Sequence, residues 1–167
     1  MDTATTPKSF PMIVRQAGRD IISVRDALGR SAPAPVVVIS GGADTLDPAI
    51  VPKLTQLIGR GLIRADQTAG AVFMDGGTDA GVTALIGRAA VTVIGVAPEA
   101  LVECPDISPA EAVGGRVALA PNHTHFVLTQ GEVWGAETPV IFDLAQAIAG
   151  KLPVIVIMIG GGQVALS

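Results

Sequence analysis

The chain has 167 residues and a formal net charge of −4, and 49% of its residues are hydrophobic while only 3% are aromatic. This length fits one domain with a sizeable core, which must be built mainly from aliphatic side chains. The acidic balance and the scatter of Lys and Arg along the chain argue against nucleic-acid binding, because that function needs a basic patch.

Cys104 is the single cysteine, so the chain has no internal disulfide and no zinc-binding set of cysteines. Residues 1–9 are polar and lack the character of a signal peptide. No apolar stretch reaches the roughly 18 residues that a membrane span requires. We therefore predict a cytoplasmic protein without a membrane span, and we assign it no metal and no cofactor.

The first predicted elements follow a flexible tail at residues 1–10, and residues 11–167 are expected to form a single domain. A short strand is predicted at residues 12–14. Apolar residues at helical spacing predict an amphipathic helix within residues 18–28, ended by Gly29.

A continuous apolar run predicts a buried strand at residues 36–39. Asp47 and Pro48 look like a helix N-cap followed by a proline at the first helical position. Apolar residues then recur at helical spacing as far as Leu62, which predicts a helix that packs one face on the sheet. The next strand is predicted at residues 71–74.

The second half of the chain continues this alternation. It is predicted to contain a helix at 82–89, a strand at 91–96, a long loop at 98–121, a strand at 126–129, a helix at 140–148 and a strand at 153–159. Alternating strands and helices are typical of an α/β fold, here a Rossmann-like, mostly parallel, doubly wound three-layer sheet. A helix should follow the last strand, so we expect a domain that is truncated at its C-terminus or completed by a partner subunit.

Short glycine runs directly follow three predicted strands, at residues 41–42, 76–77 and 160–162. Glycines between a strand and a helix let a phosphate approach the backbone N–H groups at the positive end of that helix. In a parallel sheet the ligand crevice lies outside the carboxyl ends of the strands. The pattern therefore predicts an anion-binding hollow formed jointly by these turns.

Residues 76–81, Gly-Gly-Thr-Asp-Ala-Gly, are the strongest chemical signal in the chain. The Thr78 hydroxyl is suited to donate to a phosphate or ribose oxygen. The Asp79 carboxylate is negatively charged and would repel a phosphate. We therefore expect Asp79 to bind ribose hydroxyls or to cap the following helix. The spacing matches neither a dinucleotide-binding fingerprint nor a Walker loop. A tight turn without a ligand is the alternative interpretation.

His123 and His125 alternate near the start of a predicted strand, and this spacing can place two metal ligands on one face. No cysteine or carboxylate with matching spacing accompanies them, so metal binding is not the preferred interpretation. We expect Asn122 and His123 to line a ligand-binding loop and His125 to pack at the start of the strand.

A second candidate site lies at residues 131–138, between a predicted strand and a predicted helix. Trp134, the only tryptophan, can stack on a base or fill a core or interface position. Either Glu137 or Thr138 is expected to cap the helix. Glu132 and Glu137 are the candidate catalytic residues, because their carboxyl groups can act as acid or base, although solvated loop carboxylates are commoner.

Four motifs occur in order along the chain: Val-Ile-Ser-Gly-Gly-Ala at 38–43, Arg-Gly-Leu-Ile-Arg-Ala-Asp-Gln-Thr-Ala-Gly-Ala at 60–71, Gly-Gly-Thr-Asp-Ala-Gly-Val at 76–82 and Asn-His-Thr-His-Phe-Val-Leu at 122–128. Together they resemble the LSDAT branch of the SLOG superfamily. That branch includes the cytosolic N-terminal domain of melastatin-type transient receptor potential channels and stand-alone prokaryotic relatives. The resemblance extends from Val36 to the C-terminus and implies a Rossmann-like fold.

The resemblance also implies a pocket for a nucleotide derivative, with ADP-ribose or an NAD-related molecule as the leading candidates. By position, the pocket would be formed by Gly41, Gly42, Gly76, Gly77, Thr78, Asp79, Gly81, Gly95, Asn122, His123, Gly135, Glu137, Gly161 and Gly162. Channel members use arginines for ADP-ribose, one of them in the helix that corresponds to residues 139–149, and this segment has no Arg or Lys here. A pyrophosphate would then depend on backbone N–H groups and on Arg88 or Arg116.

The superfamily's enzymes, the Lonely-guy phosphoribohydrolases, carry Pro-Gly-Gly-x-Gly-Thr-x-x-Glu at the last glycine loop. The matching residues 161–167 have no Gly-Thr pair and no Glu, which weakens an enzymatic interpretation. Our first hypothesis is a sensor domain that binds a nucleotide-derived small molecule and forms a homo-oligomer. The alternatives are a Lonely-guy-like nucleotide N-glycosidase or phosphoribohydrolase that uses Glu132 or Glu137, and a non-catalytic assembly module that associates through its apolar C-terminal strand.

Overall fold

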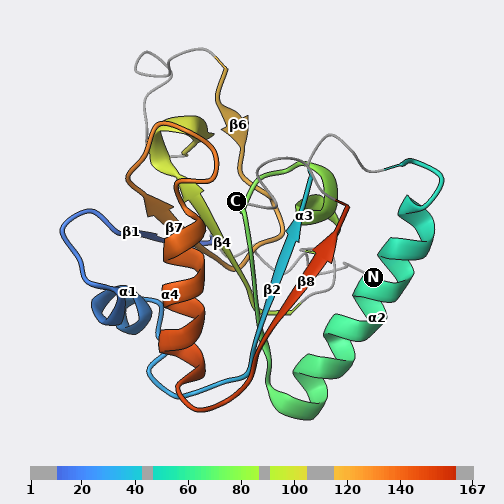
Figure 1. Cartoon of the computed structure of the whole chain (residues 1–167), viewed down its shortest axis with the longest axis horizontal. Coiled ribbons are helices and arrows are strands. Elements are labelled where there is room, and N and C mark those ends of the chain that lie inside the picture. Colours follow the sequence, from blue (N-terminus) through green and yellow to red (C-terminus); the bar gives the residue numbers. More distant parts are fainter. Residues whose placement is uncertain (1–10, 43–46, 87–90, 105–114, 161–167) are drawn as a thin grey trace, which may run out of the picture.

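The described residues of the computed structural model, 11–42, 47–86, 91–104 and 115–160, form a parallel six-stranded sheet between two layers of helices (Figure 1). The strands lie in the spatial order β1-β7-β4-β3-β2-β8. Their bounds are β1 (Met12–Arg15), β2 (Val36–Gly41), β3 (Val72–Asp75), β4 (Val93–Pro98), β7 (His125–Thr129) and β8 (Val154–Ile159). This arrangement confirms the predicted Rossmann-like α/β fold.

Among the described residues, two helices cover each face of the sheet. They are α1 (Ile21–Ala27) and α4 (Thr138–Ala149) on one face, and α2 (Val51–Ala69) and α3 (Gly81–Ile86) on the other (Figure 1). The handedness of the crossovers explains this division. The chain steps from β2 to β3, β4 and β7 in one direction and returns from β7 to β8 in the other, so right-handed crossovers place α2 and α4 on opposite faces.

The buried strands supply the core on both faces, as their continuous apolar runs predict. On the α1/α4 face, Val38 packs in one cluster with Leu144 and Ile148. On the α2/α3 face, Phe73 packs in a second cluster with Ile58, which lies on the inner face of α2. Because both faces are filled, any ligand must approach from an edge of the sheet.

The first helix is shorter than the sequence suggested because Asp20 acts as its N-cap. The Ser23 backbone N–H donates to Asp20 Oδ1 at 2.9 Å, and α1 begins one residue after the cap. Hydrogen bonds from the Ser23 backbone and hydroxyl hold the pKa of the Asp20 carboxyl below its usual value. At the other end, Gly29 has a φ of +69°, as expected for a residue that ends a helix.

The start of α2 differs from the prediction. Asp47 Oδ1 accepts a hydrogen bond from the Ala49 N–H at 2.9 Å, and the Asp47 carbonyl accepts one from the Ile50 N–H at 3.0 Å. Asp47 and Pro48 therefore form a turn that precedes the helix. Ile50 is the N-cap and Pro52 lies in the first turn, so the predicted Asp-Pro cap was wrong by one turn.

Gly95, predicted near the end of a strand, lies inside β4, where the backbone of the turn after β3 packs directly against it. A Cβ at Gly95 would lie 2.5 Å from Gly77 Cα and 2.8 Å from the Phe126 ring. Gly77 has a φ of +68°. Glycine at both positions therefore permits a close contact between two backbone segments, which no other residue type would fit.

The segment expected to be one long loop after β4 contains short elements. They are η2 (Glu99–Leu101), β5 (Val102–Glu103) and β6 (Val117–Ala118), and β5 pairs with β6 in parallel. A bridge between Thr78 and Leu119 then ties the segment to the turn after β3. The predicted tail at residues 1–10 lies outside the described residues. Among the helices that the structure describes, none has the length and apolar character to cross a membrane.

Candidate functional site

A topological switch point lies between β4 and β7. After β4 the chain runs over the α2/α3 face, where it bridges to Thr78, whereas after β7 it enters α4 on the opposite face. Open α/β sheets bind their ligands outside the carboxyl ends of the two strands at such a point, because the connections diverge there. We therefore take the ends of β4 and β7 as the centre of the candidate site.

Polar side chains from three strands gather at this edge of the sheet. Arg15, at the end of β1, pairs with Glu99, just after β4, with 2.6 Å between Nε and Oε1. Because β7 lies between β1 and β4, this ion pair spans the end of β7. The last residue of β7 is Thr129, which is buried and whose Oγ1 has no hydrogen-bond partner among the described residues.

Glu137 places a buried carboxyl group at the amino end of α4. It occupies the N-cap position, but its side chain accepts a hydrogen bond from the Gly135 N–H at 2.9 Å and makes no capping bond to the helix. Burial raises the pKa of the Glu137 carboxyl, and the bond from Gly135 opposes that rise only in part. Carboxyl groups with raised pKa values are enriched at functional sites, where they donate a proton or a hydrogen bond.

The loop between β7 and α4 presents exposed side chains beside Glu137. Gly131 and Gly135 adopt φ values of +144° and +97°, which favour glycine. Trp134 and Glu132 are exposed. Trp134 therefore does not fill the core of this chain.

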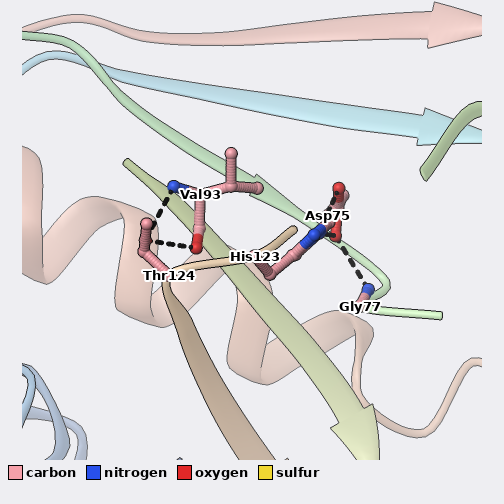
Figure 2. A network of polar contacts seen from close by, with 5 residues as sticks. All are labelled: Asp75, Gly77, Val93, His123 and Thr124. Carbon is pink, nitrogen blue, oxygen red and sulfur yellow. Dashed lines mark hydrogen bonds and ion pairs between the residues drawn. The ribbon is translucent and has the colours of Figure 1, made fainter. Parts of the chain in front are cut away.

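The turn that follows β3 is held by the buried carboxylate of Asp75, as Figure 2 shows. Asp75 Oδ1 accepts the Gly77 N–H at 2.8 Å. His123 Nε2 lies 2.8 and 2.9 Å from the two carboxylate oxygens. A carboxylate only accepts hydrogen bonds, so Nε2 must carry the proton. The predicted glycine turn is thus locked to a histidine that lies 48 positions further along the chain.

His123 is buried rather than facing solvent. Its ring stacks on Phe126 with 5.5 Å between centroids, and its Nδ1 has no partner among the described residues. The next residue, Thr124, accepts the Val93 N–H at 3.1 Å and donates its hydroxyl to the Val93 carbonyl at 2.9 Å (Figure 2). His123 is therefore engaged by Asp75, whereas its neighbour Asn122 is exposed.

The glycine turn after β2 is closely packed by the protein itself. A Cβ at Gly41 would lie 2.6 Å from the Ile159 carbonyl oxygen and 2.9 Å from the Val82 side chain. Val82 belongs to α3, the helix that follows the turn after β3. The β2 and β3 turns are therefore close in space, but a valine side chain stands beside Gly41. By contrast, a Cβ at Gly76 would meet nothing within 4 Å.

Of the remaining predicted residues, some lie within the described part of the chain and three lie outside it. Gly42 is half-buried after β2, and Asp79 is exposed, with its backbone N–H donating to the Ala118 carbonyl. Gly81 begins α3 with a φ of +53°, and Arg116 Nε is buried without a partner among the described residues. The predictions for Gly161, Gly162 and Arg88 lie outside the described residues.

The described part of the chain shows no side-chain group suited to a metal ion. Within it, no three His, Cys, Asp or Glu side chains are grouped so as to hold a metal ion. His123 is engaged by Asp75, and His125 Nδ1 lies 2.8 Å from Thr124 Oγ1. Burial, and secondarily the positive charge of Arg30, lower the pKa of His125.

Two residues of this region were not anticipated from the sequence. The sequence analysis gives Asp75 no role, although an aspartate directly before two glycines is a recognisable turn signal. Thr129 carries no such signal, because a threonine at the end of a strand is ordinary and its missing hydrogen bond is visible only in three dimensions. The switch point likewise depends on the spatial order of strands.

A parallel α/β sheet with divergent connections at its carboxyl edge defines a Rossmann-like domain. The chain belongs to the family described as SLOG in TRPM, prokaryote, which matches residues 34–167. This confirms the resemblance found in the four sequence motifs.

Several animal ion channels contain a related segment. The chain is 27% identical over 174 residues to transient receptor potential cation channel subfamily M member 2 of Rattus norvegicus, covering 80% of this chain and 11% of the channel. It is 29% identical over 169 residues to subfamily M member-like 2 of Nematostella vectensis, covering 76% of this chain and 11% of that protein. A third match, 26% identical over 167 residues, is subfamily M member 1 of Mus musculus, with 78% of this chain and 10% of that channel covered. The chain therefore spans about a tenth of the length of these relatives.

Proposed function

We propose that this chain binds a nucleotide derivative, with ADP-ribose or an NAD-related molecule as the leading ligand, and that it acts as a sensor domain. The observation that supports this most directly is the switch point between β4 and β7, with the amino end of α4 and the buried carboxyl of Glu137 beside it. We include in the proposal a cytoplasmic location, a single domain over residues 11–167 and self-association.

The groups at the edge suggest a division of roles. The amino end of α4 carries partial positive charge and would attract a phosphate, with the Val140 N–H as the donor, because the Thr138 N–H donates to the Gly135 carbonyl and Pro139 has no N–H. A carboxyl group repels phosphate but accepts or donates hydrogen bonds to hydroxyls, so Glu137 would bind a ribose diol. The exposed Trp134 would stack on the base. Asp79, exposed at the turn after β3, would add a polar contact, whereas the exposed Asn122 precedes β7 and so lies at the other end of that strand from Glu137.

Isothermal titration with ADP-ribose, NAD, AMP and cyclic nucleotides tests the proposal. We expect binding by at least one of the first two. Glu137→Gln should weaken that binding by about tenfold, since one hydrogen bond to a buried charged or polar group is worth about 1.4 kcal/mol. The matched control is Asp143→Asn, an exposed carboxyl on the same helix, which should leave the affinity unchanged. Folded protein that binds none of the ligands would refute the proposal.

A second candidate function is favoured by one observation, the raised pKa of the Glu137 carboxyl. A carboxyl group that keeps its proton more strongly can protonate the leaving base when an N-glycosidic bond breaks. The test is incubation with nucleoside monophosphates and NAD, followed by chromatographic detection of the released base. Release that is lost in Glu137→Gln and kept in Glu132→Gln would support a hydrolase, and no release by the unmodified chain would exclude it.

A further inference from the structure

A cluster of polar side chains lies at the amino ends of β4 and β7, at the edge of the sheet opposite to the candidate site. Thr92 directly precedes β4, and His125 is the first residue of β7. Arg30 follows α1 and donates from Nη2 to Thr92 Oγ1 at 3.3 Å. His125 pairs in register with Ile94, which belongs to the core cluster packed against α1 and α4, so its side chain lies on the face that α1 covers. Arg30 and His125 therefore lie at the same end of the same face.

Arg30 uses few of its hydrogen-bond donors. A guanidinium group carries five N–H donors. Among the described residues, the bond to Thr92 is the one hydrogen bond that the half-buried Arg30 side chain makes, and its Nε is buried without a partner. No carboxylate of the described residues lies within ion-pair distance of it. A charge that leaves water without a partner costs free energy, so Arg30 has both charge and donors to offer to an anion.

The hydrogen bonds of Thr124 determine which ring nitrogen of His125 carries a proton. Thr124 Oγ1 accepts the Val93 N–H at 3.1 Å and donates its own proton to the Val93 carbonyl at 2.9 Å (Figure 2). That hydroxyl has no second proton to give, so its 2.8 Å contact with His125 Nδ1 requires the proton to be on the ring nitrogen. Nε2 of neutral His125 is therefore unprotonated, and a proton taken up there creates a second cation at this end of the sheet.

The charges around His125 are all of one sign. Burial and the positive charge of Arg30 lower the pKa of His125, and no carboxylate of the described residues opposes them. The strands on either side, β1 and β4, place Met12 and Ile94 next to His125, and neither of these residues is charged. A nearby like charge disfavours the charged form of a group. An anion that contacts both Arg30 and His125 would offset this repulsion.

We propose that Arg30 and His125 form a second binding site, which takes a doubly charged oxyanion of the phosphate or sulfate type and binds one proton together with it. The proton comes from solvent and goes to His125 Nε2, so two positive charges meet the two negative charges of the ligand. The guanidinium of Arg30 suits such a ligand, because its planar fork of N–H groups matches the spacing of oxyanion oxygens. The site lies at the opposite edge of the sheet from Glu137, so the inference goes beyond the proposed nucleotide site.

Proton NMR of the His125 ring tests the inference directly, because the chain has only two histidines. Sulfate is the probe, since it keeps both charges across the pH range in which histidine titrates, and chloride at equal ionic strength is the reference. We expect sulfate to raise the pKa of His125 more than chloride does. Above that pKa, the affinity for sulfate should rise by up to about tenfold for each unit by which the pH falls, because one proton is bound with the anion. Inorganic phosphate and glycerol phosphate distinguish a site for the free ion from a site for a phosphate group on a larger molecule, and binding of either supports the inference.

Two variants assign the effect to these side chains. Arg30→Gln should weaken sulfate binding by about tenfold or more, because charge-assisted hydrogen bonds are lost. The matched control is Arg19→Gln, which removes the same charge from an exposed position after β1 and should keep the affinity. His125→Gln should abolish the pH dependence of sulfate binding, which keeps the test decisive if Arg30→Gln does not fold.

Sulfate that affects His125 no more than chloride does, an affinity that is independent of pH, or equal losses in Arg30→Gln and Arg19→Gln would overturn the inference. Glu137→Gln should leave sulfate binding at His125 unchanged. Chemical-shift changes confined to the amino end of α4 would also overturn this inference, while they would favour the phosphate contact of the proposed nucleotide site. A failure of one proposal is therefore distinguishable from a failure of the other.

Discussion

Removing the carboxylate of Asp75 should strongly destabilise the fold, since Asp75 is 1% exposed and holds two donors, one in the adjacent turn and one in a distant part of the chain. In Asp75→Ala, the Gly77 N–H and the His123 Nε2–H lose their acceptors while remaining buried. Each buried donor left unpaired costs about 1–3 kcal/mol, and two donors lose their acceptor in this variant. We therefore expect the free energy of unfolding to fall by about 3–5 kcal/mol.

Equilibrium urea denaturation at neutral pH, followed by circular dichroism, measures this change. Domains are stable by only about 5–15 kcal/mol, so the shift of the unfolding midpoint should be large. Glu99→Gln breaks the partly exposed pair with Arg15 and should cost at most about 1 kcal/mol, which makes it the comparison. A double-mutant cycle of Asp75→Ala with His123→Phe should give a coupling above about 1 kcal/mol. A loss below about 1 kcal/mol in Asp75→Ala would refute the view that this carboxylate locks the glycine turn.

Three other predictions follow from the structure. Gly95→Ala should destabilise the protein by about 1–3 kcal/mol or more, because the new Cβ would overlap Gly77. Gly61 lies within α2, where a Cβ would meet nothing within 4 Å, so Gly61→Ala should stabilise the protein by about 0.5–1 kcal/mol. The midpoints of urea unfolding measure both changes. Burial raises the pKa of Glu137, so the folded state holds this proton more tightly than the unfolded chain does. The free energy of unfolding should therefore fall as pH rises from the ordinary glutamate range through the raised pKa. Unfolding curves at several pH values measure this dependence, which Glu137→Gln should remove. Thr129→Val should be neutral or stabilising by up to about 1 kcal/mol in thermal unfolding, because the buried hydroxyl has no described partner, and a clear loss of stability would show that it has one.

The fold was predictable because the buried strands are continuous apolar runs, and a helical pattern follows β2, β3 and β7. The strand bounds at 36–41 and 154–159 agree with the runs that predict them to within two residues. The prediction failed where the sequence offers two signals of the same kind. Pro48 and Pro52 both fit the first turn of a helix, and hydrogen bonding by Asp47 decides between them. Gly95 looked like the end of a strand because the glycine-to-backbone contact that requires it comes from a different part of the chain.

The candidate site was predictable only in its chemistry. Sequence placed Glu137 and the glycine turns beside strand ends, and the structure adds where those ends lie. The switch point depends on the order of strands, and the Asp75–His123 pair joins residues that no local pattern connects. A buried carboxyl with a raised pKa at Glu137 likewise follows from packing, because the same residue in an open loop would be an ordinary solvated glutamate.

The pairing of β2 with β8 also bears on how the chain reaches its native state. Val36 pairs with Val154, which lies more than a hundred residues later in the chain. One edge of β2 therefore has no partner strand until β3, β4 and β7 have been synthesised. Parallel pairing over such a separation is slow, because a long loop must close before any contact forms. During synthesis the nascent chain therefore exposes an incomplete sheet with an unpaired apolar strand, which is prone to aggregate. A chaperone would be most useful to the protein at this stage.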